Sequence, residues 1–232
     1  MATRNTRAWG RATGCLAVMS FALVGCGTDV VKLDAGALEQ LRRTPEIKVV
    51  HYLPPNLEVQ GTTQFGYGAA AGTSAGIQAH ARDQYAGDMM FVDPVLRIRD
   101  KVTTAVVKTI DNKNLTPMQT PVQDMSIERL RGVVGSGTVM DFATTYWAVA
   151  PLPYSQHDLV LYRGRARLVQ FPEGKVLWQG LCDVEAEDSV GMPTNKSAPV
   201  TKGQAIAGTF ENLADRCSDH LLAQFNASGA GR

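Results

Sequence analysis

Residues 158–187, DLVLYRGRARLVQFPEGKVLWQGLCDVEAE, decide the fold of this chain. Apolar and polar residues alternate on both sides of Pro172-Glu173-Gly174, and this period of two predicts a β-hairpin. The apolar positions of both strands are even-numbered: Val160, Tyr162, Ala166, Leu168, Val176, Trp178, Cys182 and Val184. Paired residues share a face, so a three-residue loop that places Phe171 opposite Lys175 fits the pattern. Gly174 suits the left-handed position of such a loop.

The same register gathers three arginines on the polar face of the hairpin, namely Arg163, Arg165 and Arg167. Arg163 then faces Asp183, which predicts a cross-strand ion pair worth at most about 1 kcal/mol. A row of surface arginines is most often a solvated face. The alternative is a contact with lipid headgroups or the cell wall.

Other segments supply the remaining elements. Residues 47–53, IKVVHYL, and residues 138–149, TVMDFATTYWAV, read as strands. Asp93-Pro94 opens a helix because aspartate can accept a bond from a free backbone N–H and proline suits the first helical position. The apolar residues that follow at spacings of three and four predict a helix over 94–111, and the same spacing predicts another over 202–225. A short helix is expected over 126–134.

These elements predict an α+β domain of two layers. We expect a mainly antiparallel sheet of about four strands, near residues 47, 138, 158 and 175, with the two long helices packed on one face.

The start of the chain has the layout of a secretory signal. Arg4, Arg7 and Arg11 precede the apolar run Cys15–Val24, which is too short to span a bilayer. The run ends in Leu23-Val24-Gly25-Cys26, which resembles the lipobox of bacterial lipoproteins. The resemblance implies cleavage before Cys26 and attachment of lipid to it, and several acyl chains anchor a protein stably. The alternative is an ordinary cleaved signal with an incidental cysteine.

The signal defines the expected organisation: residues 1–25 are a signal peptide, 26–46 a lipidated tether with a short helix around 35–42, and 47–232 a single periplasmic domain. A Gly/Ala-rich insertion lies near residues 61–87. Gly27 follows the lipobox cysteine, where aspartate would favour retention in the inner membrane. The outer membrane, periplasmic side, is therefore the expected location.

The two remaining cysteines, Cys182 and Cys217, predict a disulfide, since an exported protein meets an oxidising compartment. Cys182 lies on the apolar face of its strand and Cys217 on the apolar stripe of its helix, so both point into one core. A zinc site is the alternative, but two isolated cysteines lack its close ligand spacing. No metal and no cofactor is expected, because H-E-x-x-H, Walker and Cys-x-x-Cys motifs are missing from the sequence.

Charge excludes one class of partner. Without residues 1–25 the chain keeps 20 Lys plus Arg and 22 Asp plus Glu, a net charge of −2. This balance lacks the basic footprint of a nucleic-acid-binding protein. The expected partner is the membrane, through the N-terminal lipid, and an envelope protein partner is left open.

Ser74 is the one candidate nucleophile. It lies in Gly72-Thr73-Ser74-Ala75-Gly76, which matches G-x-S-x-G and resembles the patatin-like lipases. Such an enzyme needs a strand before the serine and an Asp-Gly pair, whereas Gly68-Ala69-Ala70-Ala71 is a poor strand and Asp-Gly does not occur in the sequence. The four histidines, at 51, 80, 157 and 220, are too scattered to nominate a base. A loop in a Gly-rich tract is the favoured interpretation.

The chain from Asp93 onward resembles uncharacterised lipoproteins of Gram-negative bacteria. The resemblance rests on the following residues: Val50-His51-Tyr52 before a proline, Asp93-Pro94, Trp147, the turn Gly174-Lys175-Val176-Leu177, Cys182 and Cys217. It implies a non-enzymatic periplasmic lipoprotein, an accessory or binding component of the envelope. A serine hydrolase using Ser74 is the alternative.

Overall fold

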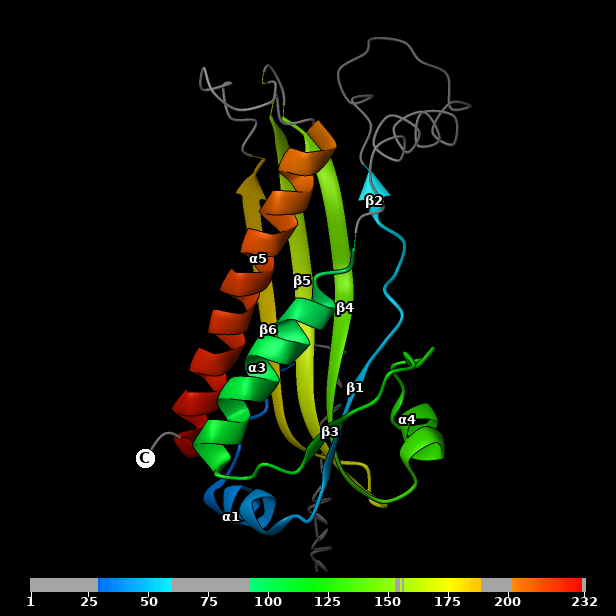
Figure 1. The fold of residues 1–232 in the computed structure, drawn as a ribbon, viewed down its shortest axis with the longest axis vertical. Helices are drawn as coiled ribbons and strands as arrows, with labels where there is room; N and C mark the ends of the chain where they lie inside the picture. Colours follow the sequence, from blue (N-terminus) through cyan, green and yellow to red (C-terminus); the bar gives the residue numbers. More distant parts are fainter. Residues whose placement is uncertain (1–28, 60–91, 153–154, 156, 189–201, 231–232) are drawn as a thin grey trace, which may run out of the picture.

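The computed structural model describes residues 29–59, 92–152, 155, 157–188 and 202–230. In these residues one mixed sheet of six strands is accompanied by four α-helices (Figure 1). The strands are β1 (Ile47–His51), β2 (Glu58–Val59), β3 (Leu115–Pro117), β4 (Gly137–Pro151), β5 (Asp158–Phe171) and β6 (Lys175–Glu187). The helices are α1 (Ala35–Arg43), α3 (Val95–Ile110), α4 (Ile127–Val134) and α5 (Lys202–Phe225), and a short π-helix, Asn226–Ala230, follows α5.

The strand order is β3-β1-β4-β5-β6, with β2 also paired to β4. β4, β5 and β6 are antiparallel, whereas β1 runs parallel to both β3 and β4, and β2 runs parallel to β4. The α+β class is therefore confirmed, but the mainly antiparallel four-stranded sheet is wrong in detail. The short strands β2 and β3 were not expected, because runs of two and three residues carry no measurable periodicity.

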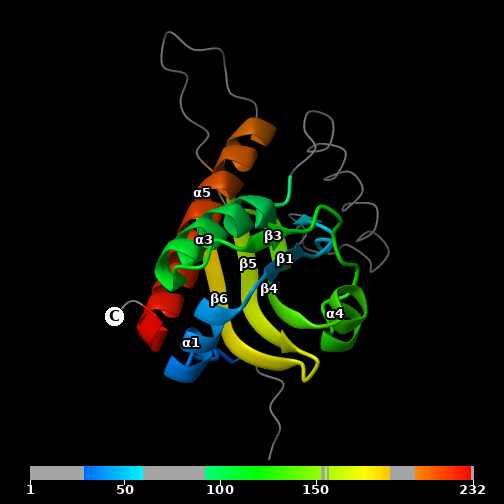
Figure 2. The same ribbon diagram turned by 60° about the horizontal axis from the view of Figure 1, so that its bottom comes forward.

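The chain connections explain the placement of the helices. From β1 the chain moves outward through α3 to β3, and from β3 it moves back past β1 through α4 to β4. Connections between parallel strands are almost always right-handed, so two connections in opposite directions place their helices on opposite faces. α3 and α5 pack together on one face, while α4 lies on the other (Figure 2), so the expectation of two long helices on one face is incomplete.

The hairpin follows the predicted register over most of its length, including Arg163 opposite Asp183 and Gly164 opposite Cys182. Near the turn a β-bulge changes it, because Leu168 pairs with Trp178 but Val169 pairs with Val176. Gln170, rather than Phe171, therefore lies opposite Lys175. The extra residue turns Val176 away from the face of Trp178. Gly174 adopts a positive φ of 72°, as the turn requires.

The face that carries α3 and α5, here called the inner face, holds the main core. Its strand residues are mainly apolar, and Trp178 packs edge-on against Phe225 of α5 at 5.2 Å between ring centroids. Trp147 packs against Phe210 of the same helix and donates its ring N–H to the carbonyl of Pro55 at 2.7 Å. α1 adds Leu38 and Leu41 to this core.

The opposite face, here called the outer face, carries a smaller core at the end of the sheet near the hairpin turn. Leu130 and Val134 of α4 pack there on Val139, Val169 and residues before α4. Ser126 caps α4 by accepting a hydrogen bond from the N–H of Arg129. Beyond α4 the outer face is lined by the odd-numbered residues of β5, among them the three arginines.

The described part of the segment 26–46, residues 29–46, packs against the sheet. The expected helix around residues 35–42 is α1, which is capped by Asp34 and buried through Ala37, Leu38 and Leu41. Val31 already pairs with Gln179 of β6 through two backbone hydrogen bonds of 3.0 and 2.9 Å. From Val31 onward the chain therefore belongs to the domain.

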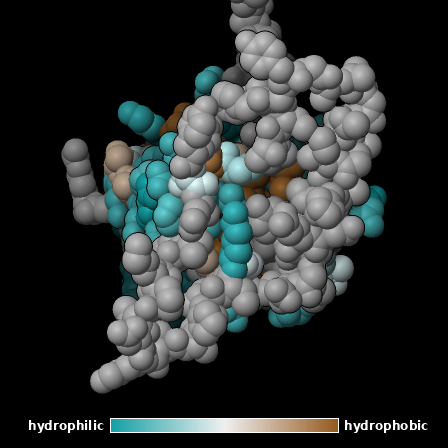
Figure 3. All heavy atoms as spheres, turned by 90° about the horizontal axis from the view of Figure 1, so that it is seen from above, coloured by the Kyte–Doolittle hydropathy of each residue, from teal (hydrophilic) through white to brown (hydrophobic). Residues whose placement is uncertain are grey.

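None of the helices in the described residues is long and apolar enough to span a membrane. Viewed from above, the coloured residues at the surface are mainly hydrophilic, with a small hydrophobic group between them (Figure 3). The Gly/Ala-rich stretch near 61–87 lies outside the described residues.

Candidate functional site

The arginine row of β5 is divided into three different environments. Arg167, nearest the hairpin turn, is 6% exposed, Arg165 is half-buried and Arg163 is exposed. The interpretation as a uniformly solvated face is therefore wrong at Arg167. The cause is tertiary, because α4 and the segment before it cover only one end of the row.

Arg167 forms a buried ion pair with Asp141 on β4, directly opposite in the register. Its Nη2 donates to Asp141 Oδ2 at 2.6 Å and its Nε donates to Asp141 Oδ1 at 3.1 Å. Nη2 also donates to the carbonyl of Met125, at 3.1 Å, in the segment before α4. Burial alone would disfavour the guanidinium, but Asp141 and Tyr52 outweigh it and raise the pKa of Arg167.

Tyr52 completes this cluster from the chain that follows β1. Its hydroxyl donates to Asp141 Oδ2 at 3.0 Å and accepts a bond from Arg167 Nη2 at 3.3 Å. Burial, followed by the charge of Asp141, raises the pKa of Tyr52, so the phenol stays protonated and donates. The cluster thus satisfies its own charges and has the form of a structural network.

Arg165 lies next in the row and differs because none of the ion pairs among the described residues includes it. Its direct neighbours across the sheet are Ala143 and Leu181, neither of which can pair with a guanidinium. Its Nε and Nη2 are buried and have no hydrogen-bond partner within the part of the chain that the structure describes. Burial, followed by the charge of Arg167, lowers the pKa of Arg165. A buried donor without a partner carries a free-energy cost that an oxyanion would remove.

Arg163 forms the predicted ion pair with Asp183, with 2.9 Å between Nε and Oδ2. The two side chains are 52% and 65% exposed, so the pair contributes little to stability. The guanidinium also lies over the ring of Tyr146, 5.3 Å from its centroid. A register shift in β4 between Thr144 and Tyr146 brings this ring onto the outer face opposite Arg163.

The N-terminal segment reaches the same region. The side chain of Gln179 donates to the carbonyl of Asp29 at 2.7 Å. Gln179 is the direct partner of Arg167 in the register, so its side chain shares the outer face with the arginine row. Asp29 therefore lies beside the row and only three residues after Cys26.

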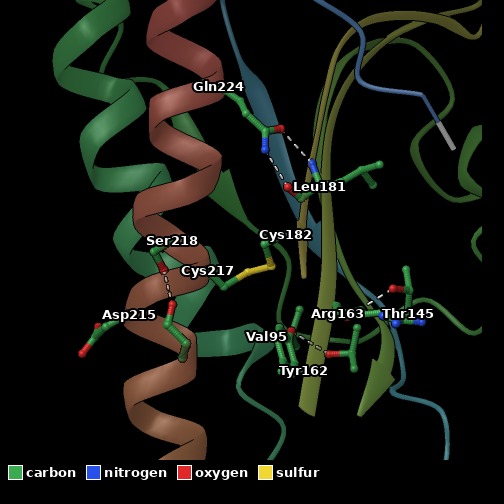
Figure 4. Close-up of a disulfide and its surroundings, with 12 residues drawn as sticks. Val95, Thr145, Tyr162, Arg163, Leu181, Cys182, Asp215, Cys217, Ser218 and Gln224 are labelled. Carbon is green, nitrogen blue, oxygen red and sulfur yellow. Dashed lines mark hydrogen bonds between the residues drawn. A yellow bond between two sulfur atoms is a disulfide. The ribbon is translucent and has the colours of Figure 1, made fainter. Parts of the chain in front are cut away.

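On the inner face, the structure contains the predicted disulfide between Cys182 of β6 and Cys217 of α5, with 5.3 Å between the two Cα atoms (Figure 4). Gly164 on β5 makes room for it, because a Cβ there would lie 3.2 Å from the sulfur of Cys182. Figure 4 also shows Gln224 reaching the backbone of Leu181. Its amide donates to the Leu181 carbonyl at 2.7 Å and accepts from the Leu181 N–H at 3.0 Å.

A second polar cluster lies at the open end of the hairpin. His157 Nδ1 approaches the carbonyl and the side chain of Asp188 at 2.8 and 3.1 Å. The same carboxylate accepts the N–H of Asp158 at 2.9 Å, and Lys202 pairs with Asp158 at 2.9 Å. The carbonyl of Asp188, followed by its carboxylate, raises the pKa of His157. These contacts tie the ends of β5 and β6 to the start of α5.

Within the described residues, no group of three or more His, Cys, Asp or Glu side chains is arranged to hold a metal ion. His51 is buried, and its Nδ1 lies 3.4 Å from Arg99 of α3. Burial, followed by the charge of Arg99, lowers the pKa of His51. Cys26 and Ser74 both lie outside the described residues, as does His80.

Sequence reasoning missed Asp141, Tyr52 and the pair of Asp158 and Asp188. Asp141 interrupts an apolar strand opposite Arg167, and that placement is a usable signal once the pairing of β4 with β5 is known. The role of Asp188 depends on the closure of the hairpin ends, for which the sequence offers no comparable signal.

No protein-family model matches the chain, and no curated protein matches it. Solved structures with a similar arrangement include a DUF330 protein from Xanthomonas campestris, 13% identical with a TM-score of 0.37, the match covering 79% of this chain and 85% of that one. A lipoprotein from Neisseria meningitidis is 17% identical, with a TM-score of 0.25 and coverages of 73% and 99%. A chain of a PelC dodecamer from Paraburkholderia phytofirmans is 8% identical, with a TM-score of 0.32, and the match covers 78% of this chain and 88% of that one.

Proposed function

We propose that this protein is a non-enzymatic lipoprotein, anchored through Cys26 to the periplasmic side of the outer membrane, whose domain serves as an accessory or binding component of the envelope. The observation that carries the proposal is the arginine-led apolar run that ends in Leu23-Val24-Gly25-Cys26. The attachment of Asp29 and Val31 to β6 supports a domain held close to its anchor.

The length of the link sets the distance from the membrane. An extended chain spans at most about 3.6 Å per residue, so the link from Cys26 to Asp29 reaches about 11 Å at most. A lipid on Cys26 would then hold the edge strand β6 within reach of the headgroups. The part of the domain beside this link is the outer face with its arginine row.

Substitution of Cys26 by alanine tests the anchor. The wild-type protein is expected in the outer-membrane fraction with acyl groups on the mature N-terminus, measured by fractionation and mass spectrometry. The Cys26→Ala variant is expected in the soluble periplasmic fraction. A variant that still sediments with membranes, together with a wild-type N-terminus free of acyl groups, would contradict the proposal.

The alternative function is a serine hydrolase, which the G-x-S-x-G motif around Ser74 supports. The two functions predict opposite results when Ser74 is tested as a nucleophile. As a non-enzymatic protein, the purified chain should not react with a fluorophosphonate probe. Labelling of the wild type that disappears in Ser74→Ala would replace the proposed function with a serine hydrolase.

A further inference from the structure

We infer that Arg165 binds the phosphate group of an anionic phospholipid in the membrane leaflet that holds the protein's anchor. The inference rests on the proposed function, because it needs the domain to be held at that membrane. The site is on the outer face of the sheet, at the middle arginine of the row.

The charges of the row lead to this residue. Two of the three arginines form ion pairs: Arg167 with Asp141, and Arg163 with Asp183. Arg165 lies between the two pairs, with apolar neighbours on both adjacent strands. The acidic residues Glu185 and Glu187 lie further along β6, opposite Leu161 and Leu159. Arg165, at the centre of the row, is therefore the one arginine of the row without an ion pair among the described residues.

The atoms of Arg165 that lack partners indicate the shape of the ligand. They are Nε and Nη2, two buried N–H groups on one edge of the guanidinium; when the half-buried side chain turns toward solvent, they can donate together to two oxygens of one anion. Arg167, one position along the same face, uses the same two nitrogens to hold the carboxylate of Asp141. A phosphate has the oxygen spacing that this edge accepts.

The location favours a lipid as the source of the phosphate. Asp29 lies beside the row through its bond with Gln179 and is separated from Cys26 by a link of about 11 Å at most. An acylated Cys26 lies in the headgroup region, so headgroup phosphates are concentrated at this face. A phosphate dissolved in the periplasm has no such enrichment.

The first test measures Arg165 in the wild-type protein. The mature lipidated chain, with ¹⁵N-labelled arginine, is placed in phosphatidylcholine nanodiscs, and the Nε–H signal of Arg165 is assigned by its loss in Arg165→Lys. Raising the fraction of phosphatidylglycerol should shift this signal progressively to saturation. The signal of the exposed Arg129 on α4 serves as the control and should stay unchanged.

Inorganic phosphate distinguishes the sources. Millimolar phosphate added to pure phosphatidylcholine nanodiscs should leave the Arg165 signal in place. An equal shift with inorganic phosphate would overturn the lipid assignment, and no shift with either ligand would overturn the site. Failure of the protein to enter nanodiscs would instead contradict the proposed function, so the two failures are distinguishable.

A second test counts bound lipid by native mass spectrometry of protein released from mixed nanodiscs. Arg165→Gln should lower the ratio of phosphatidylglycerol-bound to free protein about tenfold, as expected for the loss of one bidentate charged contact. Arg163→Gln, which removes an exposed arginine of the same row, should change it less than about twofold. Equal effects of the two substitutions would show general surface charge instead of a site at Arg165.

Discussion

The two faces of the sheet use the same strands for different purposes. On the inner face, even-numbered residues of β5 are apolar and pack beneath α3 and α5, where the disulfide joins helix to sheet. On the outer face, the odd-numbered residues of β5 include three arginines, and α4 covers only the end nearest the turn. The comparison teaches that the larger apolar core lies on one face, while the other face carries charged residues whose burial differs from one end of the row to the other.

The buried pair at Arg167 gives the sharpest contrast with the rest of its face. Asp141→Ala leaves the Arg167 guanidinium buried without a carboxylate, and we expect a loss of about 3–5 kcal/mol in the free energy of unfolding. Asp183→Ala is the matched control, since it removes the carboxylate of an exposed pair and should cost about 0–1 kcal/mol. Urea denaturation of the two variants measures the difference. Similar losses in free energy of unfolding for the two variants would show that the buried and the exposed ion pair contribute equally to stability.

The disulfide tests the stabilisation of the inner face. Cys182→Ala combined with Cys217→Ala removes a bond between residues 35 apart, and we expect a loss of about 2–4 kcal/mol in the free energy of unfolding. The measurement is urea denaturation of the double variant beside the wild type. Alkylation of unreduced wild-type protein should add no alkyl group at either cysteine, and two adducts there would refute the bond in the purified protein.

Gln224 tests a smaller contribution at the boundary between the faces, on the edge of β6 beside the bridge between Val31 and Gln179. Its side-chain amide makes the two hydrogen bonds to Leu181 that a neighbouring strand would make. Gln224→Ala leaves both backbone groups of Leu181 without these partners and should lower the free energy of unfolding by about 1–2 kcal/mol. Gln224→Glu keeps the acceptor for the Leu181 N–H but loses the donor to the Leu181 carbonyl. Its free energy of unfolding should therefore lie between those of the wild type and Gln224→Ala. Faster exchange of the Leu181 amide hydrogen in Gln224→Ala locates the effect. Unchanged exchange would mean that the side chain does not protect the edge.

The smallest expected effect concerns pH at the open end of the hairpin. The raised pKa of His157 means that the folded state favours its protonated form, so its charge stabilises the fold fully below about pH 6.5, the unfolded value. That contribution is lost as the pH rises through the folded pKa. The difference in free energy of unfolding between wild type and His157→Gln should therefore shrink as the pH rises above about 6.5, measured by urea denaturation at each pH. A difference that grows with pH would reverse the sign of the coupling with Asp188.

The local sequence pattern was sufficient to predict the elements that bury a regular stripe of apolar residues. The hairpin of β5 and β6, the long helices α3 and α5, and the meeting of Cys182 with Cys217 all follow from periods of two and 3.6 residues. These periods place side chains on a face before any partner is known, so the disulfide was predictable from two faces that must meet in one core.

Only the tertiary structure decided the order of the strands and which arginines of the row are buried or paired. The parallel placement of β1 beside β4 depends on crossover connections through α3 and α4, and the bulge that turns Val176 depends on packing against α4. Arg163, Arg165 and Arg167 are equivalent in the sequence, since each follows the same alternation. They differ in the fold because the carboxylates and the covering helix come from distant segments, and burial, which sets the energy of a charge, is a property of the assembled chain.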